Sequence, residues 1–134
     1  MKFLLDTNIC IYLIKNKPPS VLRHFQAHPV GEIGISSITV AELQYGVYKS
    51  RYVSRNQQAL EQFLAPLVVA DFDYRAAVVY GQIRAQLEAQ GLPIGSLDML
   101  IAAHALSLNL TLVTHNTREF SRIPGLAIAD WAVE

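Results

Sequence analysis

The sequence has 134 residues, of which 51% are hydrophobic and 16% charged, and its formal net charge is zero. This length and composition exclude a disordered chain, and the single cysteine, Cys10, excludes an internal disulfide and a cysteine-rich zinc site. Because the net charge is zero, composition does not indicate nucleic-acid binding, and any such function must depend on local groups.

Strands and helices alternate along the chain. In chain order, we predict a strand at 2–6, helices at 8–16 and 18–28, a strand at 32–36, helices at 39–50 and 54–67, a strand at 67–72, helices at 73–91 and 96–109, and strands at 110–114 and 126–131. Asp73 and Gly91 bound the clearest helix as an N-cap and a C-terminal stop. The alternation predicts an α/β fold with a mainly parallel sheet, covered by helices on both faces, in one domain over residues 1–134.

Asp6 stands directly after the first predicted strand, in the stretch MKFLLDTNIC. In parallel α/β sheets, ligands bind beyond the carboxyl ends of the strands, which makes Asp6 a candidate functional residue. It also has a purely structural interpretation, since Asp is common in turns and as the N-cap of a following helix. The stretch alone leaves both interpretations open.

Two further acids lie near predicted helix starts. Thr39 and Glu42 have the spacing of a capping box, which explains Glu42 structurally. The same geometry puts Glu42 in the first helical turn after a strand, on the same side of the sheet as Asp6. Asp98 suits a helix N-terminus, yet its neighbours are apolar, so its carboxylate must reach solvent or a compensating cation.

The last polar stretch, LVTHNTREF, follows the predicted strand at 110–114. It reads as an ordinary polar loop before a helical turn. It also lies at the carboxyl end of a strand, where its oxygen donors, Asn116 and Glu119, can join the other acids at one sheet edge.

Carboxylates that share one site repel one another and raise each other's pKa, so such a cluster is unfavourable without a cation. Oxygen donors without a Cys or His cluster suit Mg²⁺ or Mn²⁺ rather than Zn²⁺. Such an ion activates a water and neutralises charge on a phosphate, which suits phosphodiester cleavage without a protein nucleophile. The side chains expected at this edge are Asp6, Glu42, Asp98 and Asn116 or Glu119.

Four stretches in order, LLDTNICIYLIK, ISSITVAELQYG, PIGSLDMLIAAHA and LVTHNTREF, resemble a PIN-domain ribonuclease, in particular the VapC-type toxins of bacterial toxin–antitoxin pairs. The resemblance covers essentially the whole chain. It implies a compact α/β/α sandwich, a Mg²⁺- or Mn²⁺-dependent endoribonuclease acting on RNA such as tRNA, and a homodimer. It also implies neutralisation by a small antitoxin, which binds DNA through its own domain.

The resemblance also assigns roles to single residues. The acids that it implies as catalytic metal ligands are Asp6, Glu42 and Asp98. It implies Thr7 and Asn8 as polar support of the first acid, Asp6, and Thr114 is a further expected supporting residue. Many PIN domains carry a fourth acid shortly after the last core strand, where this chain has Asn116, and Glu119 is a candidate for the missing carboxylate.

Histidines and basic residues have weaker assignments. The candidates for RNA contacts are Arg84, Arg118 and His115. His104 stands between two alanines on a predicted helix, and we expect it to be a packing residue rather than a general base.

Two alternative functions stay open. The first is a catalytically inactive PIN-like binding module. The second is a phosphotransferase with Asp6 as nucleophile, although haloacid-dehalogenase-like enzymes usually carry a second Asp two residues later, where this chain has Asn8.

The apolar content suggests a covered surface rather than a membrane span. Mean hydropathy is +0.24, so we expect a partner or a second copy to cover part of the apolar surface. Asp6 and Asn8 interrupt the apolar start, and no apolar run of about 18 residues follows. We therefore expect a cytoplasmic protein.

Overall fold

The centre of the computed structural model is one sheet of five strands in the order β3-β2-β1-β4-β5, and every pairing is parallel. The strands are β1 (Phe3–Leu5), β2 (Ile33–Ser36), β3 (Val68–Ala70), β4 (Thr111–Val113) and β5 (Ile128–Ala129). The structure describes residues 1–133, and Glu134, the last residue of the predicted domain, lies outside the described residues. The predicted parallel sheet is confirmed, with no antiparallel pair among these strands.

Helices follow the strands as the sequence predicts. They are α1 (Thr7–Lys15), α2 (Pro19–Gln26), the 3₁₀ helix η1 (Val30–Glu32), α3 (Ser37–Lys49), α4 (Val53–Leu64), α5 (Tyr74–Ala89), α6 (Ser96–Ser107) and α7 (Thr117–Phe120). Asp73 accepts a hydrogen bond from the Ala76 amide as the N-cap of α5, and Gly91 after this helix has a positive φ of 69°. Both predicted helix ends are confirmed.

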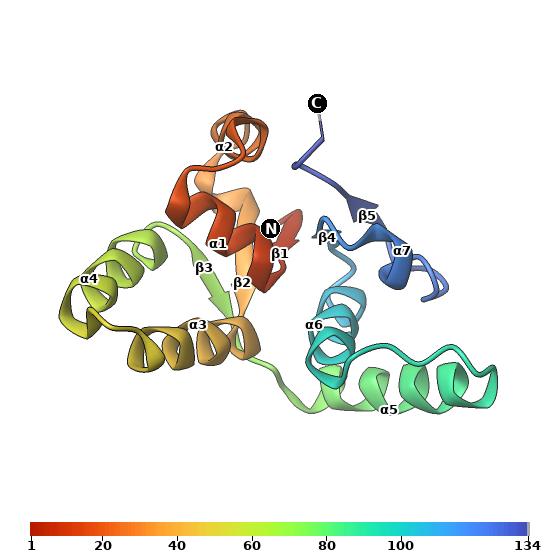
Figure 1. Cartoon of the computed structure of the whole chain (residues 1–134). Coiled ribbons are helices and arrows are strands. Elements are labelled where there is room, and N and C mark those ends of the chain that lie inside the picture. Colours follow the sequence, from red (N-terminus) through yellow and green to blue (C-terminus); the bar gives the residue numbers. More distant parts are fainter. Residues whose placement is uncertain (134) are drawn as a thin grey trace.

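Successive strand residues point to opposite faces of the sheet and divide the core in two. Leu4 and Leu112 pack in one cluster with residues of α5 and α6. Leu5 and Val113 pack in the other cluster with residues of α1, α3 and α4. Figure 1 shows α1 to α4 on the left of the molecule and α5 and α6 at the lower right. The two-faced core confirms the α/β/α sandwich.

The start of α3 differs from the prediction. The expected capping box of Thr39 and Glu42 is wrong, because β2 runs directly into α3 and Ser36 serves as the N-cap, accepting a 3.0 Å hydrogen bond from the Ile38 amide. Within residues 1–133 the buried Thr39 hydroxyl has no hydrogen-bond partner. Glu42 therefore lies beyond the first turn, and its carboxylate is free for another contact.

The strand order reverses next to β1. From β1 the chain moves outward through β2 to β3, and it then returns to the opposite side of β1 through β4 and β5. The order thus reverses between β1 and β4, the kind of position at which open parallel sheets bind ligands. The Asp6 amide donates to the Val113 carbonyl at 3.0 Å across this point.

No helix among residues 1–133 has the length and apolar character needed to cross a bilayer.

Candidate active site

Asp6 is both a helix N-cap and a candidate functional residue at the end of a strand. It follows β1 and is the N-cap of α1, with Oδ1 accepting a 2.8 Å hydrogen bond from the Ile9 amide. Only 4% of the residue is exposed. The cap contact fixes the direction of a buried carboxylate, so the structural and the functional interpretation do not exclude each other.

The environment of Asp6 disfavours its charge. The pKa of Asp6 is raised from the ordinary 3.8 to about 6, chiefly because burial disfavours its charge, and the charges of Asp98 and Glu42 contribute to this rise. Hydrogen bonds from the Thr114 side chain and the Ile9 amide oppose this rise. The repulsion shows that three acids from separate parts of the chain lie within electrostatic range of one another.

Glu42 is held by a residue from another helix. The Thr7 hydroxyl, in the first turn of α1, donates a 2.7 Å hydrogen bond to Glu42 Oε1. The resemblance implies Thr7 as support of Asp6, whereas in the structure the partner of its hydroxyl is the carboxylate of Glu42. Asn8 is exposed.

Asp98 lies in the first turn of α6. Burial raises the pKa of Asp98, and the charges of Glu119 and Glu42 raise it further. Glu119 is thus the fourth acid of the group. Within residues 1–133, none of these four carboxylates forms an ion pair with a lysine or arginine.

The segment after β4 supports Asp6 through Thr114. This residue is fully buried, and its Oγ1 also accepts a 2.9 Å hydrogen bond from the Asn116 amide. Asn116 is the N-cap of α7, but its side chain makes no capping hydrogen bond. Thr114 thereby links the backbone ahead of Glu119 to the carboxylate of Asp6.

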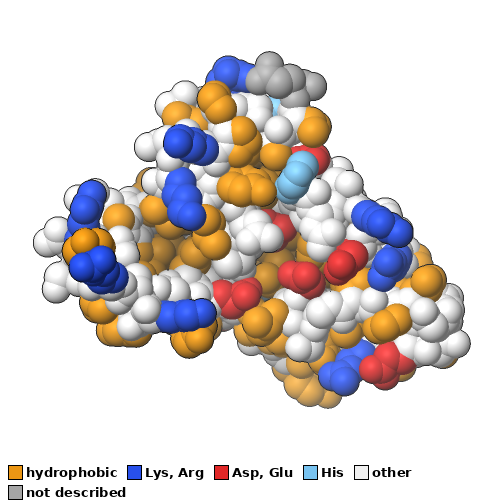
Figure 2. Space-filling view, viewed as in Figure 1, with side chains coloured by type: hydrophobic (Ala, Val, Ile, Leu, Met, Phe, Trp, Pro, Cys, Tyr) orange, Lys and Arg blue, Asp and Glu red, His pale blue; other side chains and the backbone are white. Residues whose placement is uncertain are grey.

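The four acids fit a divalent cation by their chemistry and their charge. All their donor atoms are oxygen, and a cation between them relieves the repulsion that raises the pKa of Asp6 and Asp98. In the described chain, no three acidic, histidine or cysteine side chains stand close enough to hold an ion as they are now arranged. Figure 2 shows acidic side chains gathered near the middle of one face.

The expected RNA-contact residues have different surroundings. Arg84 is exposed on α5 and hydrogen-bonds to Glu88 at 3.2 Å and Tyr80 at 2.9 Å, within its own helix. His115 Nδ1 lies 3.0 Å from Asp130 Oδ2 at the end of β5. Arg118 is exposed on α7, next to Glu119 in the chain.

We call Asp6, Glu42, Asp98 and Glu119 the acid cluster. An apolar groove of about 400 Å³ begins at Glu42 of this cluster and runs between α1, α3 and α4. Thr7 and Glu42 line its end, and Figure 2 shows the hydrophobic side chains in this hollow beside the acids. The groove was not located by the sequence, because its walls come from three helices. Its main apolar lining residues are Ile11, Ile14, Leu43, Val47 and Leu60.

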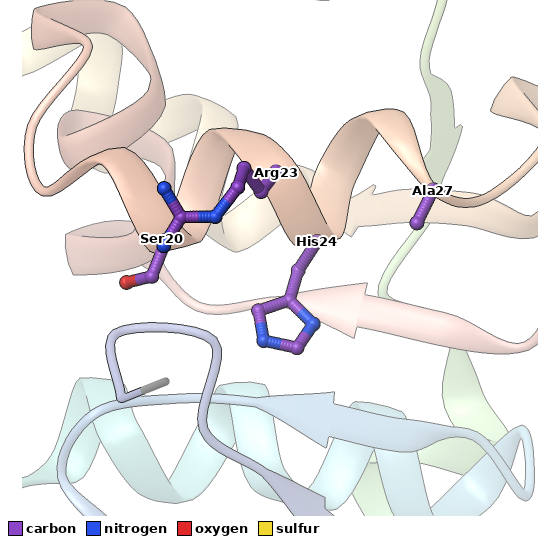
Figure 3. A pocket seen from close by; sticks show the side chains of 4 residues that line it. All are labelled: Ser20, Arg23, His24 and Ala27. Carbon is purple, nitrogen blue, oxygen red and sulfur yellow. The ribbon is translucent and has the colours of Figure 1, made fainter.

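A second cavity of about 240 Å³ lies along α2 and is lined by Ser20, Arg23, His24 and Ala27. Figure 3 shows Ser20, Arg23 and His24 along α2, with Ala27 where the helix ends. The Trp131 ring stacks on His24, with the ring centroids 5.9 Å apart. None of these residues lines the groove or belongs to the acid cluster, so this cavity is separate from the candidate active site.

Fold and site together define a class of protein. It is an α/β/α protein that carries, near the carboxyl ends of its central strands, a group of acids without a lysine or arginine ion pair in the described part of the chain. The family model described as "PIN domain" matches residues 3–126, so the chain belongs to the PIN-domain family.

Known relatives are similar over nearly the full length. A "tRNA(fMet)-specific endonuclease VapC" of Shigella flexneri is 50% identical over 132 residues, covering 98% of this chain and 99% of the relative. A "Ribonuclease VapC2" of Rickettsia felis is 46% identical over 132 residues, covering 98% of both chains. The resemblance to VapC-type PIN proteins is confirmed.

Solved structures agree with these relatives. A DNA-bound VapBC from Salmonella typhimurium matches with a TM-score of 0.93 and 49% identity, covering 98% of both chains. VapBC2 from Rickettsia felis, bound to a DNA fragment from its promoter, matches with a TM-score of 0.90 and 45% identity, covering 98% of this chain and 99% of that one. The fold and its element order are therefore those of VapC-type proteins.

Proposed function

We propose that this chain is a metal-dependent endoribonuclease toxin that cleaves a structured RNA such as tRNA and is neutralised by a cognate antitoxin. The observation that carries the proposal is that Asp6, Glu42 and Asp98 come together at one sheet edge and that none of them forms an ion pair with a lysine or arginine within residues 1–133. The likeness to a VapC relative named as a tRNA(fMet)-specific endonuclease supports RNA as substrate and tRNA as its class.

Asp6, Glu42 and Asp98 would hold a Mg²⁺ or Mn²⁺ ion, with Glu119 or Asn116 as a further donor. The chemistry that the bound ion supplies is acidification of the attacking water and neutralisation of charge on the phosphate. Burial and then the charge of Glu119 raise the pKa of Asp98, and the influence of this charge favours Glu119 over Asn116 as the fourth donor.

The other residues of the site orient these donors. The Thr7 hydroxyl holds one oxygen of Glu42, and the Thr114 side chain together with the Ile9 amide holds Asp6. The two contacts to Asp6 favour its charged form, which is the form that binds a cation. His115 and Arg118 flank Asn116 and Glu119 in the chain and are proposed as phosphate contacts at the rim, with Arg84 as a more remote candidate.

The test of this function is cleavage of tRNA by purified protein with its metal controlled. Cleavage should require Mg²⁺ or Mn²⁺, stop with EDTA and return when the metal is restored, whereas Asp6→Asn should stay inactive throughout. Full activity in metal-free buffer contradicts the mechanism. RNA binding without cleavage favours the inactive binding module, and a covalent phosphate on Asp6 favours the phosphotransferase.

The apolar groove is proposed as the docking site of an antitoxin segment. The matched solved structures include VapBC complexes with DNA, and we propose that this chain reaches DNA only through such a partner. The groove offers an apolar floor at Leu43 and Leu60 and ends at Glu42, so an occupant there also blocks the acid cluster.

A second copy of the chain is a further proposed partner. Large apolar side chains stay exposed on α3 and α5, among them Tyr48 at 68% and Tyr74 at 84%, and a homodimer would cover such surface. Sedimentation of the purified protein at micromolar concentration should give a dimer, and a monomer contradicts the proposal. A cytoplasmic location goes with this function.

A further inference from the structure

His104 is buried in α6, and the proposed chemistry does not use it. Only 1% of the residue is exposed, which confirms the expectation of a packing role. Its ring nevertheless forms a hydrogen bond: Nδ1 lies 2.8 Å from Oγ of Ser36, which is 68 positions away in the sequence.

We propose that His104 is a positioning residue that holds the helix carrying Asp98 against the N-cap of the helix carrying Glu42. This inference rests on the proposed function, since it concerns how two of the proposed metal ligands are kept in register.

The contact with His104 affects the proposed metal ligands through Ser36. It ends β2, and its Oγ caps α3, the helix that carries Glu42. The register pairs Leu5 with Ile35, so the residues that follow them, Asp6 and Ser36, stand side by side at the carboxyl edge of the sheet. A shift of Ser36 therefore moves the start of α3 relative to Asp6.

The His104 ring also has Asp71 and Phe72 as neighbours. Burial lowers the pKa of His104, and the charge of Asp73 and a hydrogen bond with the Asp71 backbone oppose this effect. Because that bond favours the protonated ring, its acceptor is the Asp71 carbonyl. Ser36 Oγ, 2.8 Å from Nδ1, is a second polar partner of the same ring. The Phe72 ring covers the imidazole edge-on, with centroids 5.4 Å apart.

The ring thus joins three elements through one side chain. Asp98 lies six residues before His104 on α6, Ser36 ends β2 and caps α3, and Asp71 follows β3. An apolar side chain of similar size fills the same space but holds neither Ser36 nor the Asp71 carbonyl. Loss of the two bonds lets α6 shift against α3, and a misplacement of about 1 Å at a catalytic group reduces activity by roughly a hundredfold.

The experiment compares His104→Leu, which removes both bonds, with His104→Asn, whose amide reaches the Nδ1 position. Mn²⁺ affinity is measured by calorimetry on metal-free protein, and kcat and KM are measured on tRNA, all at a temperature at which each variant is folded. For His104→Leu we expect Mn²⁺ affinity and kcat to fall roughly tenfold or more, with KM nearly unchanged. His104→Asn should recover most of both.

The matched control is Ser107→Ala. Ser107 is buried in α6 and its hydroxyl donates to the His104 carbonyl at 2.8 Å, within the same helix. This variant should melt at a lower temperature but keep wild-type Mn²⁺ affinity and kcat. If His104→Leu loses only stability, as Ser107→Ala does, the positioning role is overturned.

If His104→Leu does not fold, Ser36→Ala decides the question, since it removes the same link from the other side. Wild-type Mn²⁺ affinity in folded Ser36→Ala overturns the inference. Wild-type protein that neither binds Mn²⁺ nor cleaves RNA overturns the proposed function, whereas an active wild type with an equally active His104→Leu overturns the positioning role alone.

Discussion

The Thr7 hydroxyl on α1 donates a 2.7 Å hydrogen bond to Glu42 Oε1 on α3. Thr7 immediately follows Asp6 in the chain, so one short stretch supplies a buried carboxylate and also orients a second carboxylate from a helix 35 residues further on. The strand-to-helix junction at Asp6 and Thr7 therefore fixes the position of Glu42 relative to Asp6. This coupling matters for any ligand that needs both acids.

Thr7→Val keeps the shape of the side chain and removes the donor. We expect it to lower Mg²⁺ affinity or kcat by roughly tenfold, the usual effect of removing a group that orients a metal ligand. Thr7→Ser should keep most of the wild-type values, because the hydroxyl remains. Metal titrations of the cleavage rate measure both, and wild-type behaviour of Thr7→Val contradicts the role.

The pKa of Asp6 predicts a pH dependence of stability. Because the folded pKa of about 6 exceeds the ordinary 3.8, the folded protein holds this proton more tightly than the unfolded chain does. The contribution of Asp6 to the free energy of unfolding of metal-free protein should therefore fall as pH rises from about 4 to 6 and stay constant above. Over this window the loss amounts to about 3 kcal/mol.

Urea unfolding of wild type and Asp6→Asn in EDTA, between pH 4 and pH 7, isolates this contribution. The stability of Asp6→Asn relative to wild type should increase through the window. Metal binding needs the carboxylate, so Mg²⁺ affinity of the wild type should rise as pH passes 6. A constant stability difference between the two proteins contradicts the raised pKa.

Asp98→Asn removes one of the repelling charges at nearly constant shape. It should abolish cleavage, because the metal loses a ligand. It should also raise the melting temperature in EDTA, since about 1 kcal/mol of relieved repulsion shifts a domain of this size by a few degrees. Added Mg²⁺ should stabilise the wild type more than the variant. A variant that melts lower than wild type in EDTA identifies Asp98 as a structural helix-start acid.

Glu119→Gln tests the fourth donor against Asn116→Ala. If Glu119 holds the metal with Asp98, Glu119→Gln should weaken metal affinity or activity by roughly tenfold, while Asn116→Ala changes it less. The charge of Glu119 acts on Asp98, which supports this order. Metal titration of both variants checks it, and the reverse order assigns the role to Asn116.

Ile14→Glu puts a charge on the wall of the apolar groove, away from the acids. It should leave tRNA cleavage unchanged but prevent neutralisation, because the antitoxin segment would have to bury an unpaired carboxylate. Leu92→Glu makes the same change at an exposed leucine that does not line the groove, and this variant should still be neutralised. Cleavage assays with added antitoxin distinguish the two. If the antitoxin neutralises both variants equally, it does not bind in the groove.

Several features of this protein were decided by its sequence alone. Apolar runs at strand spacing that alternate with helical patterns predict a parallel sheet, and the carboxyl ends of parallel strands meet at one edge. Asp6, which directly follows the first strand, was therefore a candidate without any knowledge of the strand order. The burial of His104 and the N-cap at Asp73 followed equally from local pattern.

The tertiary structure decided which side chains act on each other. Thr7 was expected to support Asp6, but it binds Glu42, and the capping box expected at Thr39 gave way to Ser36, because β2 runs into α3 without a connecting residue. The local sequence pattern predicts on which face of a helix or strand a side chain lies. A contact between residues 35 or 68 positions apart depends instead on how whole helices and strands pack. The link between His104 and Ser36 and the groove between three helices are products of that packing.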